Sequence, residues 1–349
     1  MTHWKKILQN SVNSPAELAQ HFDFDCNALE ATSASFPMRI NPYYLGLIRS
    51  VNDPLWKQAV PDPIELNDSI CIADPLAEES LSPVSNLVHK YPDRVLFLVA
   101  NECAMYCRFC TRKRKVGMTT MTITEESIEA GLNYIRKNKG IREVLLSGGD
   151  PLMLSDEKLD SLLTRLRAIP TVEVIRIGTR IPCTLPMRVT GKLATLLKKH
   201  HPLYINTHFN HPRELTPEAF KACTLLANAG IPLGCQTVLL KGVNNDAAIL
   251  KELFLGLLRM RVKPYYLFQG DLTKGTNHFR THTQDGIKIM RKLIGTISGM
   301  AVPTFALDAP GGNGKIPLTP DYILSRGNEL SFHNYCGKLC SYPENGDPL

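Results

Sequence analysis

The chain has 349 residues, of which 44% are hydrophobic and 21% charged, and its net charge is +7. This composition supports a large buried core and excludes wholesale disorder. No apolar run approaches the roughly 18 residues of a membrane-spanning helix, and residues 1–20 lack the apolar centre of a signal peptide. The sequence therefore predicts a cytoplasmic protein with no membrane partner.

Basic residues are spread along the chain, and the one dense run comprises Arg112, Lys113, Arg114 and Lys115. A nucleic-acid partner would require a broader basic patch or stripe. The run directly follows a group of cysteines, which favours a basic surface with a local anion-binding site. We therefore expect no nucleic-acid partner.

The pattern of the chain changes near residue 94. Residues 1–93 indicate helical segments joined by loops that contain prolines. From residue 94, short apolar runs typical of buried strands alternate with segments of helical periodicity. Strands are predicted at 94–100, 143–146, 172–177, 204–209, 235–240, 264–268 and 303–307. Helices are predicted at 127–137, 157–168, 193–199, 217–229, 247–260 and 284–297.

This alternation favours a parallel sheet, because strands that are apolar on both faces must be covered by helices. Six strand–helix units and a seventh strand predict an α/β fold, a partial parallel (β/α)6 barrel with a helical N-terminal extension. The predicted divisions are 1–93 for the extension, 94–325 for the barrel and 326–349 for a polar C-terminal tail.

Three of the ten cysteines lie on one short loop directly after the first predicted strand. Cys103, Cys107 and Cys110 have the spacing C-x3-C-x2-C. Three thiolates can hold three irons of a [4Fe–4S] cluster and leave the fourth iron open, whereas structural zinc and ferredoxin-type clusters use four protein ligands. A cluster is therefore favoured over zinc and over simple burial. The spacing resembles the signature of radical S-adenosylmethionine (SAM) enzymes, whose open iron binds SAM.

The second predicted strand runs into Gly148, Gly149 and Asp150, at the carboxyl edge where barrel sites lie. Glycines let a ligand approach the backbone closely, and Asp150 can accept a hydrogen bond from an ammonium group. Turns use the same residues, so the motif alone is weak evidence for a ligand site. Its position one strand–helix unit after the cysteine loop strengthens that interpretation. We predict that these three residues contact SAM.

After the last predicted strand, Gly311, Gly312 and Gly314 precede Lys315. The loop is not a Walker phosphate loop, because the spacing differs and Ile316 follows the lysine. It could be a solvated surface turn or a phosphate cradle. A lysine beside such a cradle would suit a Schiff base with pyridoxal phosphate (PLP). The residues alone leave both interpretations open.

Over residues 4–334 the sequence resembles the lysine 2,3-aminomutase family, radical SAM enzymes that also use PLP. The resemblance is carried by residues 42–44, 91–94, 103–112, 147–152, 206–211, 264–266, 278–280 and 308–315. It implies an isomerase that moves the amino group of L-lysine from C2 to C3 and yields β-lysine. It also implies a radical SAM partial barrel and a one-electron reductant such as flavodoxin or ferredoxin.

The resemblance further implies a role for each matching residue. The cysteines would ligate the cluster, and Lys315 would bind PLP covalently. The PLP phosphate would be contacted by Arg94 and the backbone of Gly311, Gly312 and Gly314, with Tyr91 beside it. SAM would be contacted by Gly148, Gly149 and Asp150, with His208 and Gln236 lining its pocket. Arg112 would bind the substrate carboxylate, and Asp271 with Asp308 would bind the side-chain ammonium.

The aspartate pair carries the substrate prediction. Two carboxylates around one buried cation neutralise it, so lysine is preferred over neutral amino acids. A glutamate-specific relative should lack the pair. Asp308 also precedes Ala-Pro-Gly, however, which is an ordinary turn context.

Two departures from the family pattern stand out. Longer aminomutases end in a cysteine-rich zinc segment that ties subunits together, whereas the last residues here contain only Cys336 and Cys340, and Asp246 stands where a partner cysteine is expected. We predict no structural zinc, which leaves a homo-oligomer possible but its arrangement open. Phe109 stands where close relatives commonly have histidine.

Three alternatives stay open at this point. The short length matches homologues that make (R)-β-lysine for modifying elongation factor P, whereas the context of Asp308 favours the free-lysine enzyme and an (S) product. The aspartate pair could also receive the guanidinium of arginine. A zinc or iron–sulfur module without catalysis, bound to nucleic acid, is the least favoured alternative.

Overall fold

The computed structural model describes residues 3–118 and 121–344. The chain begins with short helices, most of which start with a proline in the first turn behind a capping side chain. In α4, for example, the Asn41 side chain accepts hydrogen bonds from the amides of Tyr43 and Tyr44. The elements are α1 (His3–Gln9), α2 (Pro15–Leu18), α3 (Asn27–Ser35), α4 (Pro42–Leu45), α5 (Pro54–Ala59) and η1 (Pro63–Asn67). The helical N-terminal extension is therefore confirmed.

The core of the molecule is a nine-stranded sheet in the order β1 to β9. Its strands are β1 (Leu87–Tyr91), β2 (Arg94–Ala100), β3 (Glu143–Gly148), β4 (Val174–Gly178), β5 (Leu203–Thr207), β6 (Leu233–Leu239), β7 (Lys263–Gln269), β8 (Thr304–Asp308) and β9 (Lys315–Pro317). All pairings from β2 to β8 are parallel. These seven strands are the predicted ones, with ends that differ by one to two residues.

The sheet is a partial barrel rather than a closed one. Strands β1 and β9, which the sequence did not predict, pair antiparallel with β2 and β8 at its two edges. Between the described strands β1 and β9 there is no backbone pairing. Side chains approach each other there instead, since Lys90 Nζ lies 3.6 Å from Asp308 Oδ1.

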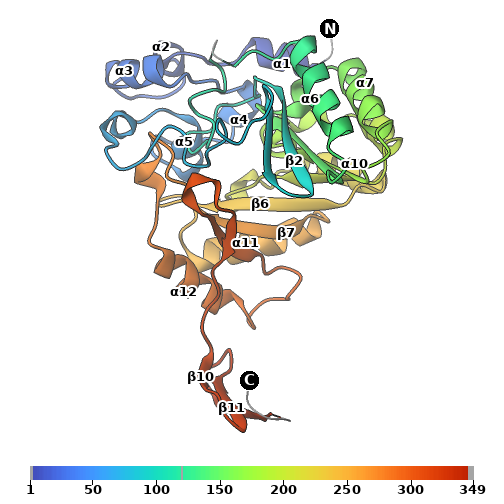
Figure 1. The fold of residues 1–349 in the computed structure, drawn as a ribbon. Helices are drawn as coiled ribbons and strands as arrows, with labels where there is room; N and C mark the ends of the chain where they lie inside the picture. Colours follow the sequence, from blue (N-terminus) through green and yellow to red (C-terminus); the bar gives the residue numbers. More distant parts are fainter. Residues whose placement is uncertain (1–2, 119–120, 345–349) are drawn as a thin grey trace.

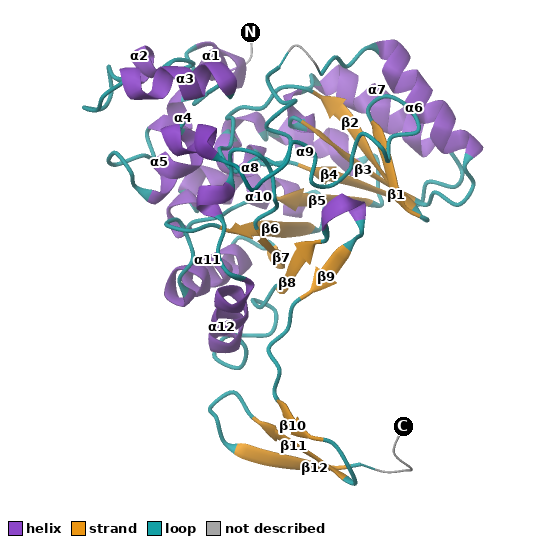
Figure 2. Ribbon diagram, turned by 60° about the vertical axis from the view of Figure 1, so that its left-hand side comes forward, coloured by secondary structure: helices purple, strands orange, loops and turns teal. Residues whose placement is uncertain are grey.

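The six predicted helices connect the parallel strands (Figures 1 and 2). They are α6 (Glu125–Lys137), α7 (Asp156–Arg167), α9 (Gly191–Lys198), α10 (Pro217–Asn228), α11 (Ala247–Arg259) and α12 (Thr283–Leu293). Shorter pieces are η2 (Pro151–Met153), α8 (Ile181–Thr184), η3 (Pro186–Arg188), η4 (Pro212–Glu214), η5 (Asn277–Phe279) and η6 (Pro310–Gly312). Helix α12 ends before its predicted limit because Gly295 adopts a φ of 81°. Across the described residues, no helix has the length and apolarity needed to cross a bilayer.

The C-terminal segment forms a second, separate sheet. Strands β10 (Ile323–Ser325), β11 (Glu329–His333) and β12 (Leu339–Pro343) pair antiparallel. In Figure 1 this sheet projects away from the barrel, at the end opposite α1–α3. The polar tail expected from residue 326 is thus folded, and its first strand begins three residues earlier. The division of the chain into three parts stays a prediction.

A buried ionic triad joins the N-terminal extension to the cysteine loop. The Glu65 carboxylate accepts from Arg108 Nε at 2.9 Å and from Lys113 Nζ at 2.6 Å. Glu65 and Arg108 are each only 1% exposed. Burial raises the pKa of Glu65, but the bonds from the two cations outweigh this and hold the pKa below its ordinary value. Arg108 follows Cys107 directly, so the triad fixes the loop from both sides of Cys110.

We predict that Glu65→Gln lowers the free energy of unfolding by about 3–5 kcal/mol, because it leaves two buried cations without a carboxylate. Urea denaturation would measure the change. The matched control is Glu79→Gln, whose carboxylate is 56% exposed and pairs with Arg114 and Lys115. The control should cost less than about 1 kcal/mol. Equal stability of Glu65→Gln and wild type would refute the role of the triad.

Candidate active site

The cysteine loop is positioned by the N-terminal extension. The amide of Tyr106 donates to the carbonyl of Arg39 at 3.1 Å, and Asn41 Nδ2 donates to the carbonyl of Ala104 at 3.0 Å. Cys103, Cys107 and Cys110 are half-buried on this loop. Burial raises the pKa of Cys103 well above its ordinary value and that of Cys110 to about 11. As in other thiolate sites, metal binding would therefore have to displace thiol protons.

The donors present fit an iron–sulfur cluster with an open iron. Three thiols lie on one loop, and Cys107 Sγ accepts a hydrogen bond from Arg180 Nη1 at 2.8 Å. Arg180 Nε is buried without a partner among the described residues, so a further donor is available to an acceptor such as a cluster sulfide. Within 3–118 and 121–344, no three His, Cys, Asp or Glu side chains are arranged around a single metal ion. Three cysteines would each hold one iron of the cluster.

Gly148 and Gly149 are required by a close approach of two backbones. A Cβ at Gly148 would lie 2.2 Å from the Ala100 carbonyl oxygen, and one at Gly149 would lie 2.3 Å from that of Glu102. The Gly149 amide donates to Ala100 O at 2.6 Å. The glycines therefore dock the start of the cysteine loop against β3. Contact between these glycines and SAM stays a prediction.

Asp150 is fully engaged with the protein. Its carboxylate accepts from Thr179 Oγ1 at 2.6 Å, from the Arg180 amide at 2.7 Å and from the Leu152 amide at 3.0 Å. Burial raises the pKa of Asp150, against the effect of these hydrogen bonds. Its evident task is to hold the turn after β4. Its predicted contact with the SAM ammonium would have to share these oxygens.

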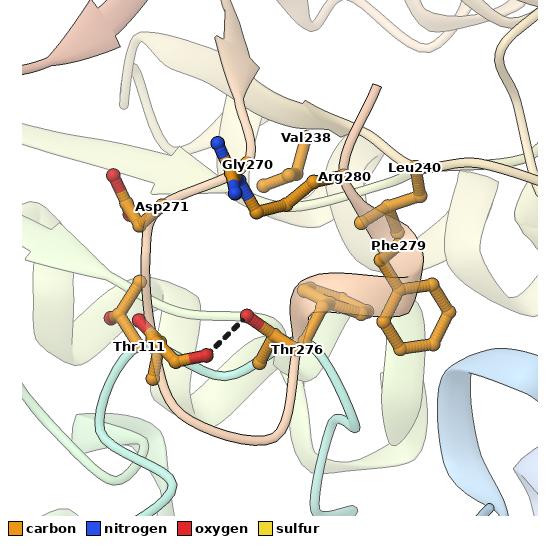
Figure 3. Close-up of a pocket in the computed structure, with 10 residues that line it drawn as sticks. Thr111, Val238, Leu240, Gly270, Asp271, Thr276, Phe279 and Arg280 are labelled. Carbon is orange, nitrogen blue, oxygen red and sulfur yellow. Dashed lines mark hydrogen bonds between the residues drawn. The ribbon is translucent and has the colours of Figure 1, made fainter. Parts of the chain in front are cut away.

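A small pocket beside the cysteine loop is lined by Phe109, Thr111, Val238, Leu240, Gly270, Asp271, Thr273, Thr276, Phe279 and Arg280. In Figure 3, Asp271 and Thr111 lie on one side and Leu240 and Phe279 on the other. Phe109 thus belongs to the apolar part of the pocket lining. Its ring could pack there against a nucleoside. The aromatic at this position of the loop is therefore compatible with a bound cofactor.

His208 lies next to this pocket, and its ring centroid is 5.4 Å from that of Phe109. Its Nε2 is 3.0 Å from Asn210 Oδ1, an acceptor, so Nε2 carries the proton and Nδ1 can accept. Burial and the charge of Arg180 lower the pKa of His208 to about 3, so the ring is neutral at physiological pH. Gln236 lies on β6 opposite Tyr266 of β7 and does not line the pocket.

The residues predicted for PLP come together across the open side of the barrel. Gly311, Gly312 and Gly314 all have positive φ, and a Cβ at Gly314 would lie 3.8 Å from Tyr91 Oη. The Arg94 guanidinium stacks on the Tyr91 ring at 3.9 Å from its centroid. With Lys90 alongside, two cations and a glycine loop form a donor set that fits a phosphate. Lys315 extends from the start of β9 at this place.

Lys315 and the aspartate pair form one charged cluster. Lys315 Nζ lies 3.0 Å from Asp308 Oδ2, and Lys90 Nζ approaches the same carboxylate. Asp271 has no hydrogen-bond or ion-pair partner recorded among the described residues. Burial and the neighbouring Asp308 raise the pKa of Asp271 to about 7. A carboxylate with a raised pKa is stabilised in its ionised form when a cation binds beside it.

Arg112 is held by a partner that the sequence did not indicate. The carboxylate of Glu78 accepts from Arg112 Nε at 3.0 Å and from Nη2 at 2.6 Å, and Arg112 Nη1 donates to Ser147 Oγ at 3.3 Å. Glu78 therefore occupies one guanidinium edge and Ser147 takes one Nη1 hydrogen. Contact between Arg112 and a substrate carboxylate stays a prediction. The rest of the basic run is also neutralised, since Arg114 pairs with Asp74 and Glu79. This pairing argues against a nucleic-acid surface.

Three residues of this region were not predicted from the sequence: Glu78, Lys90 and Arg180. Lys90 directly precedes Tyr91, so the motif 91–94 could have been extended by one residue. Glu78 and Arg180 carry no local signal, because their partners lie 34 and 73 residues away in the chain. Asp246, by contrast, has a plain structural role as the N-cap of α11. The thiols of Cys336 and Cys340 bond within their own turn.

Known proteins match this chain over nearly its whole length. A sequence model of the radical SAM superfamily matches residues 97–253, and one described as lysine-2,3-aminomutase matches residues 290–348. Together with the cysteine loop and the partial barrel, these matches define a radical SAM enzyme. The L-lysine 2,3-aminomutases of Acetoanaerobium sticklandii and Clostridium subterminale are 47% and 46% identical, over 98% of this chain and 84% of each relative.

The chain belongs to the lysine 2,3-aminomutase family, whose cofactors are a [4Fe–4S] cluster, SAM and PLP. A glutamate 2,3-aminomutase of Clostridioides difficile is also similar, with 46% identity over 86% of this chain and 72% of that protein. Overall identity therefore does not distinguish the two substrates, and the residues of the site must.

We predict that Asp271→Asn stabilises the ligand-free protein at pH 8. The folded pKa of about 7 lies above the unfolded value of about 3.9, so ionised Asp271 costs stability. This cost is absent below pH 4, accumulates up to pH 7 and is constant above it. Denaturant unfolding at pH 8 should show a gain of at least about 1.4 kcal/mol, equal to one pKa unit. A gain that is equal at pH 4 and pH 8 would contradict the shift.

Proposed function

We propose that this protein is an L-lysine 2,3-aminomutase that moves the amino group of L-lysine from C2 to C3 to give β-lysine. The observation that carries the proposal is the Asp271 carboxylate, which has no bonding partner in the described part of the chain and lies within the electrostatic influence of Asp308 and Lys315. The similarity to relatives named L-lysine 2,3-aminomutase supports it.

The carboxylate pair would select the substrate by charge. An ammonium at the end of the lysine side chain would meet Asp271 and Asp308, offset part of their negative charge and lower the pKa of Asp271. The side-chain carboxylate of glutamate would instead add a third negative charge to this place, which is strongly unfavourable. The pair therefore favours lysine over glutamate, and a guanidinium such as that of arginine is the second candidate.

Arg112 would bind the substrate carboxylate at the opposite end. Glu78 occupies its Nε edge and Ser147 one Nη1 hydrogen, so one hydrogen on Nη1 and one on Nη2 would be left to hold that carboxylate. Arg112 is 14% exposed as a side chain, and a charge pair so shielded from water is strong. A substrate held at both ends would be oriented with its C2 and C3 between the two cofactors.

The chain's own residues would hold the cofactors. Cys103, Cys107 and Cys110 would ligate the cluster, and Lys315 would carry PLP with its phosphate near Arg94, Tyr91 and the glycine loop. The cluster and SAM supply the one-electron chemistry that removes and returns a hydrogen atom, and PLP supplies the conjugated ring that supports migration of nitrogen. His208, neutral and fixed by Asn210, would present Nδ1 as an acceptor to SAM. Gln236 on β6 lies outside the small pocket beside Phe109, and it would contact SAM from the strand itself.

Electron supply, assembly and location complete the proposal. A small one-electron carrier such as flavodoxin or ferredoxin would reduce the cluster in the cytoplasm. A homo-oligomer is supported by the projecting C-terminal sheet, where Leu324, Leu339 and Tyr342 are exposed. We propose a free-lysine enzyme with an (S) product rather than a homologue that serves elongation factor P.

We predict that the reconstituted protein, supplied anaerobically with SAM, PLP, dithionite and L-lysine, forms β-lysine that mass spectrometry detects. Lys315→Ala should lose this activity, because the variant lacks the amine that would bind PLP covalently. Lys198→Ala, an exposed lysine at the end of α9, serves as the control and should keep it.

Each outcome of this assay has a meaning. Cleavage of SAM without formation of β-lysine would exclude lysine as the substrate, and arginine would be the next substrate to test. An active Lys315→Ala protein would remove Lys315 from the covalent role. Chiral chromatography of the product decides between the (S) and (R) forms, and a purely (R) product would identify the homologue that serves elongation factor P.

We further predict that Asp308→Asn raises KM for lysine by about 30-fold or more, since truncating one member of a buried charge pair costs at least about 2 kcal/mol. Asp285→Asn, an exposed carboxylate in the first turn of α12, is the matched control and should leave KM unchanged. Steady-state kinetics measure both. An unchanged KM in Asp308→Asn would overturn the substrate assignment.

A further inference from the structure

Arg180 links the turn after β4 to one of the three loop cysteines. Its guanidinium donates through Nη1 to Cys107 Sγ at 2.8 Å, the shortest approach of a cation to any of the three thiols that the structure records. Arg180 is 8% exposed, so the contact is shielded from water. Hydrogen bonds of a charged donor are markedly stronger than neutral ones. The contact is therefore more than surface proximity.

The guanidinium cannot turn away from Cys107, because its other end is bonded at two points. Nη2 donates to Gln58 Oε1 at 2.6 Å and to Glu214 Oε1 at 2.8 Å. Both partners are 0% exposed. The Arg180 backbone is fixed as well, since its amide donates to Asp150 Oδ2 at 2.7 Å.

The partners of Arg180 are themselves held rigidly. Tyr44 Oη donates to Glu214 Oε1 at 2.8 Å, and Asn210 Nδ2 donates to Gln58 Oε1 at 3.0 Å. The Arg180 guanidinium also lies 5.1 Å from the ring centroid of Phe109, two residues after Cys107. A buried network thus aims one cation at one sulfur. If Arg180 served only as a counter-ion for Glu214, its guanidinium would not need to point at Cys107. Nor would its Nε need to be buried without a partner among the described residues.

We propose that Arg180 tunes the iron–sulfur cluster by donating a charge-assisted hydrogen bond to the thiolate of Cys107. This inference rests on the proposed function only in taking Cys107 as a cluster ligand. Hydrogen bonds to cluster sulfurs and nearby charge set the reduction potential. A cation stabilises the reduced cluster, which carries one more negative charge than the oxidised one. Arg180 therefore raises the potential and makes the electron from the reductant easier to accept.

The test is a potentiometric titration of the reconstituted holoprotein, monitored by electron paramagnetic resonance, without SAM or lysine. At the potential where the wild-type cluster is half reduced, Arg180→Gln should show a ratio of reduced to oxidised cluster at least tenfold lower. For a one-electron couple this equals about 59 mV. The control is Arg176→Gln on β4, the strand that precedes Arg180; the Arg176 guanidinium bonds to Glu143 at the start of β3, and the ratio should not change in this variant.

A second measurement keeps the proposal testable if Arg180→Gln does not fold. Wild-type protein labelled with ¹⁵N in its arginine side chains should show a nitrogen coupled to the reduced cluster in pulsed paramagnetic resonance. Arg180→Lys, which keeps the charge, should lose that coupling. Absence of the coupling from wild type, or its persistence in Arg180→Lys, would overturn the proposal.

The outcomes separate this inference from the proposed function. A wild-type protein that binds no cluster overturns both. An unchanged ratio in a fully loaded Arg180→Gln protein overturns only the role of Arg180. Because the titration contains no lysine, a failure to make β-lysine has no bearing on it.

Discussion

The parallel pairing of β2 to β8 is the constraint on which the rest of the structure depends. Parallel strands end at the same edge of a sheet, so residues that are more than two hundred positions apart in the chain meet there. The cysteine loop follows β2, His208 follows β5, and Asp308 ends β8. The shared edge explains why the residues proposed to bind the cluster, SAM and the substrate lie close together. Parallel strands must also be buried on both faces, which accounts for their apolar sequences.

That same apolarity made the core predictable. The seven parallel strands and six helices could be placed from periodicity, and the cysteine and glycine motifs could be placed on the loops between them. The strands missed lack such a signal: only the first two residues of β1 are buried, β9 is exposed along its length, and β10 to β12 are short and mostly exposed. The partners of Arg112 and Cys107 could not be predicted, because a single Glu78 or Arg180 has no local pattern and acquires its meaning only from contacts across the fold.

The Gly148–Asp150 motif shows how structural and ligand roles coincide. Its glycines allow β3 to touch the start of the cysteine loop, and its carboxylate holds the turn that carries Arg180. The ligand loop, the motif and the cation near Cys107 are therefore one mechanical unit. A substitution in the motif would displace all three, even if it never touched SAM.

The missing backbone pairing between β1 and β9 has a further consequence. The two edges of the large sheet face each other across a seam, where Lys90 of β1 lies 3.6 Å from Asp308 at the end of β8. Gly314, just before β9, lies near Tyr91 of β1 at the same seam. A molecule that contacts both sides of this seam would connect the two edges of the sheet, which have no backbone hydrogen bonds to each other among the described residues. Because a ligand that binds only the folded state adds to its stability, a cofactor held by residues on both sides of this seam would stabilise the barrel against opening there. Maturation of this protein and its resistance to heat or proteolysis would then be governed by cofactor supply.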